Sequence, residues 1–116
     1  MIIQAIRDAI QGDGIDCFYP GQHKGECTKE YVVVKTGGTI STNVSSERPI
    51  YTIMCYVPVN KYSKLETLIF NTKKSIKKVF PLVSYIGNET ASYYDEDVKA
   101  HMISFQYAGC RKIENW

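Results

Sequence analysis

Residues 63–80 carry the clearest hydrophobic pattern in the chain. At about 100° per residue, seven positions fall within an arc of about 120°, which is the stripe that an amphipathic helix turns toward a core. These positions are Leu65, Leu68, Ile69, Thr72, Ile76, Val79 and Phe80. Ser63 and Glu66 have the spacing of a capping box, and Pro81 cannot continue helical hydrogen bonding. The pattern predicts one long helix over 63–80, with Leu68, Ile69, Ile76 and Phe80 in the core.

A second pattern, over residues 49–57, alternates with the period of a strand. One face carries Tyr51, Ile53, Cys55 and Val57, and the other carries Ile50, Thr52, Met54 and Tyr56. The first face should meet the long helix. The second is too apolar for free solvent, so we expect a second helix or a neighbouring subunit to cover it.

The remaining segments complete a small α+β domain. Residues 1–11 predict a short helix that ends at Gly12-Asp13-Gly14, and 17–27 predict a loop. The β-branched residues 31–35 predict a strand that Gly37-Gly38 ends, and the short polar residues of 37–48 predict a mobile loop. Further strands are expected at 82–86, at 90–94 and at 98–108, with Ile103, Phe105 and Tyr107 facing the core.

These elements predict a single domain over residues 1–116. Strands that come in runs joined by short turns favour an antiparallel, possibly mixed, sheet of about four to five strands, on which one long and one short helix pack. A chain of 116 residues is long enough to bury its own core.

The charge is concentrated on the long helix. The net charge is +2, yet residues 61–80 hold six lysines against one glutamate. A solvated helix face explains such a run, and a nucleic acid or an acidic partner surface is the alternative. Phe70 projects among these charges, away from the apolar stripe, so it is either a scattered surface aromatic or a subunit contact.

The polar residues show no pattern of catalysis or metal binding. Cys17, Cys27, Cys55 and Cys110 form no Cys-x-x-Cys pair, and Cys17, His23 and Cys27 match no common zinc spacing. Asp95 and Asp97 are a close carboxylate pair that flanks Glu96 at a predicted turn, where acids are usually solvated turn residues. We therefore expect no enzyme, no cofactor and no metal.

The opening residues lack a basic secretory start, and no apolar run approaches the length of a membrane span. We expect a soluble, cytosolic protein with reduced thiols and no membrane partner.

The order of these features resembles the small tail-terminator and minor capsid (head-tail joining) proteins of long-tailed bacteriophages, particularly those of Gram-positive hosts. The resemblance covers most of the chain. It is carried by an opening helix, Tyr19-Pro20, the strands at 31–35 and 49–57, the helix that begins Ser63-Lys-Leu-Glu66, and the corner Tyr94-Asp-Glu-Asp97 leading into 102–107.

The resemblance implies a structural virion protein of the tail or neck, assembled in the host cytoplasm. Such a subunit forms a ring, hexameric in tail terminators, which caps the tail tube and meets the head-completion or connector proteins. DNA would pass through the lumen without sequence-specific binding. The residues that we expect at interfaces are Met54, Tyr56, Phe70, Lys73, Lys74, Lys77 and Trp116.

Two other classes of function stay open. A small nucleic-acid-binding α+β module would use the lysine-rich helix 63–80, with Tyr51 and Tyr56 for stacking. Its affinity should fall steeply with salt, whereas ring assembly through apolar burial should not. A small enzyme would have to gather His23 or a cysteine into a pocket with residues scattered through the sequence.

Overall fold

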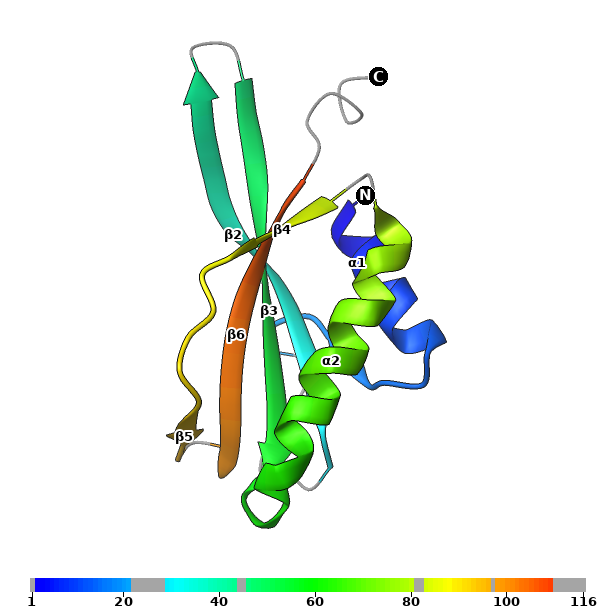
Figure 1. The fold of residues 1–116 in the computed structure, drawn as a ribbon, viewed down its shortest axis with the longest axis vertical. Helices are drawn as coiled ribbons and strands as arrows, with labels where there is room; N and C mark the ends of the chain where they lie inside the picture. Colours follow the sequence, from blue (N-terminus) through cyan, green and yellow to red (C-terminus); the bar gives the residue numbers. More distant parts are fainter. Residues whose placement is uncertain (1, 22–28, 44–45, 81–82, 97, 110–116) are drawn as a thin grey trace.

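The fold is a twisted sheet, and the helices that the structure describes lie on one side of it (Figure 1). The computed structural model describes residues 2–21, 29–43, 46–80, 83–96 and 98–109. Its architecture is α+β, with one long and one short helix, as the sequence predicts.

The helical layer has two parts. The short helix α1 (Ile2–Gly12) buries Ile2, Ile6 and Ile10. The long helical segment is built from the 3-10 turn η1 (Val59–Lys64), the helix α2 (Leu65–Ile76) and the 3-10 turn η2 (Lys77–Val79). Both helices pack into one core cluster with the inward-facing strand residues, which include Val32, Val34, Ile53, Cys55, Val57 and Phe105.

Over the described residues the sheet has six strands: five follow the order β1-β2-β3-β6-β4, and β5 pairs with the other end of β6. The strands are β1 (Cys17–Phe18), β2 (Tyr31–Asn43), β3 (Ser46–Pro58), β4 (Val83–Gly87), β5 (Tyr93–Asp95) and β6 (Ala100–Gly109). The pair β1–β2 is parallel and the other pairs are antiparallel. The prediction of four to five strands missed the two-residue strand β1, which lies inside the predicted loop 17–27.

The predicted faces of the two central strands are confirmed. Tyr51, Ile53, Cys55 and Val57 of β3 join the core under the helices, as do Phe105 and Tyr107 of β6. Met54 and Tyr56 point to the opposite side of the sheet, where they pack with Tyr31 and Val33.

Within the predicted loop 37–48, residues 37–43 belong to strand β2 and residues 46–48 to strand β3, and the two strands pair antiparallel as a β-hairpin. Strand β2 continues through the two glycines with a register shift between Thr36 and Thr39, and Thr39 to Asn43 then pair with Pro49 to Ser46. Such an irregularity lets a flexible glycine pair stay within a strand instead of ending it. That these residues are mobile stays a prediction, and it now concerns two paired strands instead of a loop.

The predicted start of the long helix and the predicted burial of Phe80 were both wrong. Ser63 lies inside η1, so it does not cap α2, whose first turn follows directly from the 3-10 turn without a side-chain cap. At the other end Phe80 takes an extended backbone, with φ −60° and ψ 136°, and it is exposed instead of buried. The residue before a proline avoids helical φ and ψ, which turns the Phe80 side chain out of the stripe.

The expectation that a second helix covers the other face of the sheet was also wrong. Because α1 contacts α2 and joins the same core cluster, both helices share one face. The face that carries Met54 and Tyr56, here called the helix-free face, therefore has no helix over it among the described residues. Covering by a neighbouring subunit stays a prediction.

Candidate functional site

A groove of about 650 Å³ lies between the long helical segment and the edge strand β4. Phe70, Lys73, Lys74, Lys77 and Phe80 line its helical side, and Val83 to Tyr85 line its strand side. Ile76 and Tyr107 also line it. We call this site the basic aromatic groove.

Large aromatic side chains are exposed along this groove. Phe70 is 67% exposed, Phe80 is 68% exposed and Tyr85 is 46% exposed. Isolated exposed aromatics are ordinary, but contiguous apolar surface rimmed by charge marks an interaction site. The groove therefore has the composition of a contact surface, in which aromatic residues are enriched.

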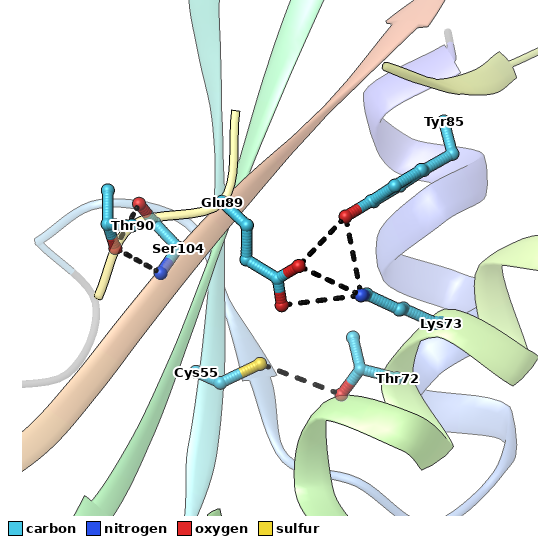
Figure 2. Close-up of polar contacts among 7 residues, drawn as sticks. All are labelled: Cys55, Thr72, Lys73, Tyr85, Glu89, Thr90 and Ser104. Carbon is cyan, nitrogen blue, oxygen red and sulfur yellow. Dashed lines mark hydrogen bonds and ion pairs between the residues drawn. The ribbon is translucent and has the colours of Figure 1, made fainter. Parts of the chain in front are cut away.

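Lys73 fixes the strand wall of the groove to the helix (Figure 2). Its Nζ donates to Tyr85 Oη at 3.3 Å and to the two carboxylate oxygens of Glu89 at 3.4 and 3.5 Å. Tyr85 Oη in turn donates to Glu89 Oε2 at 3.1 Å. The ammonium also lies 4.8 Å from the centre of the Tyr85 ring and 5.0 Å from that of Phe105.

Two opposed influences act on this lysine. Burial lowers the pKa of Lys73, whereas the Tyr85 hydroxyl and the Glu89 carboxylate raise it, and the net direction is upward. Lys73 therefore stays charged, with Glu89 neutralising it locally. Its role in the groove is to hold Tyr85 in place.

The four lysines at the C-terminal end of the long helical segment differ in their partners. Lys78 forms an ion pair with Asp13, and hydrogen bonds from Lys78 and Ser75 hold the pKa of the Asp13 carboxyl below its ordinary value. Lys73 is paired with Glu89. Among the described residues, no carboxylate pairs with Lys74 or Lys77. Lys74 still lowers the pKa of the Asp13 carboxyl through its charge. Lys74 and Lys77 therefore give the groove positive charge that no ion pair among the described residues neutralises.

The helix-free face is a different kind of surface. Tyr31, Val33 and Ala100 are buried there, and Met54 and Tyr56 are half-buried against them. The rings of Tyr31 and Tyr56 lie 4.8 Å apart. Side chains of this face thus shield one another in part, and less apolar area is open than the sequence alone predicts.

A third surface lies at the far end of β6 from the groove. Residues 93–96, Tyr-Tyr-Asp-Glu, form the short strand β5 and the turn after it, here called the acidic corner. Tyr93 is 49% exposed and Tyr94 is 42% exposed. Tyr93 Oη donates to Met102 Sδ at 3.4 Å, and the Tyr94 ring packs edge-on against His101 at 5.6 Å. Both tyrosines are therefore held in place while much of each ring remains open to solvent.

The structure brings together four of the seven residues expected at interfaces. Phe70, Lys73, Lys74 and Lys77 all line the groove. Met54 and Tyr56 lie on the opposite face of the sheet, and Trp116 lies outside the described residues.

Sequence reasoning missed Phe80 and Tyr85 as parts of the groove. The proline after Phe80 was the available signal for the first, since it disfavours a helical backbone at that residue. For Tyr85 the alternation of strand 83–87 was available, but only the fold shows that β4 lies beside α2.

The two described cysteines lie in the main core cluster. Cys55 is fully buried and its Sγ donates to Thr72 Oγ1 at 3.9 Å (Figure 2), and Cys17 is also buried. Burial raises the pKa of each thiol to about 12. His23, Cys27, Cys110 and Asp97 lie outside the described residues, and the part of the chain that is described holds no group of three metal-ligating side chains.

The surfaces described above are the basis on which we infer function. No family model matches the chain, and no curated protein matches it either. None of the helices that the structure describes is long and apolar enough to cross a membrane.

Proposed function

We propose that the protein is a ring-forming structural subunit of the phage head-tail junction, a tail terminator. The observation that carries the proposal is the basic aromatic groove, where Phe70, Phe80 and Tyr85 are all exposed along one hollow. The order of elements along the chain, which resembles that of tail-terminator and head-tail joining proteins, supports the same function.

A closed ring needs a contact between two different patches, because a patch that meets its own copy closes at a dimer. The chain offers such a difference. The groove lies on the helical side at the edge of the sheet, whereas the helix-free face and the acidic corner lie elsewhere. Each subunit can therefore offer one surface to the preceding copy and another to the next.

The proposed partners follow from this role. A hexameric ring would cap the tail tube protein on one side and meet a head-completion or connector protein on the other. DNA would cross its lumen without sequence-specific contacts. The protein would be assembled in the host cytoplasm and would end in the tail or neck of the virion.

One observation favours a second candidate, a single-stranded nucleic-acid-binding module. Lys74 and Lys77 lack carboxylate partners among the described residues, and the exposed ring of Phe70 beside them offers a base a stacking surface. Two phosphate contacts on a single strand would give a slope of about −1.4 for log K against log salt concentration. Self-assembly through aromatic burial should change far less with salt.

The mass of the protein in solution tests the first candidate. Wild type is expected to show a mass several times that of the 13.2 kDa chain by light scattering, rising with concentration. Phe70→Asp is expected to raise the protein concentration needed for assembly at least about tenfold, because a buried charge in an interface opposes its closure. Met54→Asp, on the helix-free face, tests whether that face takes part as well.

Val59→Asp is the matched control, since Val59 is also an exposed apolar residue on the long helical segment but does not line the groove. It should assemble like wild type, and circular dichroism should show all the variants folded. A wild type that stays monomeric at high concentration, also with tail-tube protein added, would exclude the ring.

A further inference from the structure

We infer that the basic aromatic groove of one copy receives the acidic corner of a second copy. The inference rests on the proposed function and names the two surfaces that would meet in the ring. Residues 93–96 of one subunit would enter the hollow between Phe70, Phe80 and Tyr85 of the next.

The charges of the two surfaces are complementary. The groove presents Lys74 and Lys77 without carboxylate partners among the described residues. In the corner Glu96 is exposed, and no described cation pairs with it. Opposite charge across an interface speeds encounter and fixes orientation, so this pairing would select the corner over other exposed segments of the chain.

The apolar parts also correspond. The groove offers the exposed rings of Phe70 and Phe80, and the corner offers Tyr93 and Tyr94. Because Met102 and His101 already hold these tyrosines, little side-chain freedom is lost when they bind. Aromatic side chains with a polar tip are common anchors of protein interfaces.

The geometry prevents the two surfaces from meeting within one copy. The start of β4 in the groove pairs with Gly109 at the end of β6, whereas Asp95 of the corner pairs with Ala100 at its start. The 10 residues of β6 separate them by about 30 Å at roughly 3.3 Å per residue. The contact must therefore form between copies, head to tail, which is the arrangement that builds rings.

Two charge reversals test the contact directly. Lys77→Glu makes the groove more acidic, and Glu96→Lys makes the corner basic, so each variant alone faces its own copies with like charges. We expect each to weaken self-association roughly tenfold, since an attraction becomes a repulsion. An equimolar mixture is expected to regain the mass of wild type. In that mixture the reversed groove of one variant would meet the reversed corner of the other, and the two unaltered surfaces would likewise meet each other.

Lys64→Glu is the control, because Lys64 is an exposed lysine of the same helical segment that does not line the groove. It should assemble like wild type and should not restore either variant in a mixture. If wild type assembles but the reversals have no effect, or their mixture stays dissociated, the inference is overturned while the ring stands. A wild type that remains monomeric and binds a single-stranded oligonucleotide through Lys77 would overturn both.

Discussion

The burial of Cys17 and Cys55 has a measurable consequence at the scale of single residues. Each thiol has a pKa raised from 9.0 to about 12, mainly because burial disfavours the thiolate. Since the thiolate is the nucleophile, iodoacetamide at about pH 8 should leave both residues unmodified in the folded protein and should modify both in guanidinium. Peptide mass mapping measures this. Labelling of Cys55 at its unfolded rate, in protein with native circular dichroism, would contradict the assigned burial.

The same shift sets the direction of a pH dependence. A group whose pKa is higher in the folded state contributes stability that is fully present below its unfolded pKa. For these thiols that contribution is intact below pH 9.0 and is lost as the pH rises toward about 12. Titration of Cys17 and Cys55 thus weakens the fold only in strongly alkaline solution.

At the scale of the element, the long helical segment depends on a few fully buried positions. Ile76 is completely buried in the main core cluster, so Ile76→Ala should cost about 2 to 5 kcal/mol of unfolding free energy. Phe80→Ala is the matched control, because Phe80 is exposed and its removal should change stability by about 0.5 kcal/mol or less. Chemical denaturation measures both. A loss below half a kcal/mol for Ile76→Ala would show that the stripe is misassigned.

The part of the β2–β3 hairpin that extends beyond β6 is expected to exchange its amide protons faster than the rest of the sheet. Strand β3 pairs with β6 only from Ile50 onward, so among the described residues 39–43 and 46–49 pair only with each other. A two-stranded ribbon is marginally stable alone. Amide exchange in the free subunit should therefore be fast at 39–48 and slow at 50–57 of the same strand. Equal protection in a verified monomer would be incompatible with the mobility expected there.

Local pattern predicted the elements well where burial alone determines them. The stripe of α2 and the alternation of β3 and β6 appear as predicted, because each face of these elements has a single environment. The strand pairing of 37–43 with 46–49 could not be predicted in this way, because the short polar residues there show no alternating hydrophobic pattern and the pairing depends on the strand opposite. The misplaced Phe80 shows a backbone restriction at Pro81 prevailing over hydrophobic periodicity.

At the scale of the whole molecule, only part of the helical side of the candidate site could be predicted from the sequence. The helix places Phe70, Lys73, Lys74 and Lys77 near one another by its period alone. Tyr85 joins them only because β4 pairs with β6 at the edge of the sheet. The hydrophobic pattern of a single segment does not reveal which strand it pairs with. The sequence also could not predict which face of the sheet α1 covers, because the apolar stripe of a helix does not specify the side on which it packs.

The close packing at Gly109 has a practical consequence for orienting subunits in images. A Cβ at this position would lie 2.9 Å from Pro49 Cγ and 3.4 Å from Ile2 Cδ1, so the first turn of α1 meets the last residue of β6. Val83 of the groove pairs with the same glycine. A compact protein label fused ahead of α1 would therefore mark the groove end of every subunit. In electron micrographs, the direction in which such labels point would reveal the handedness with which successive subunits follow one another.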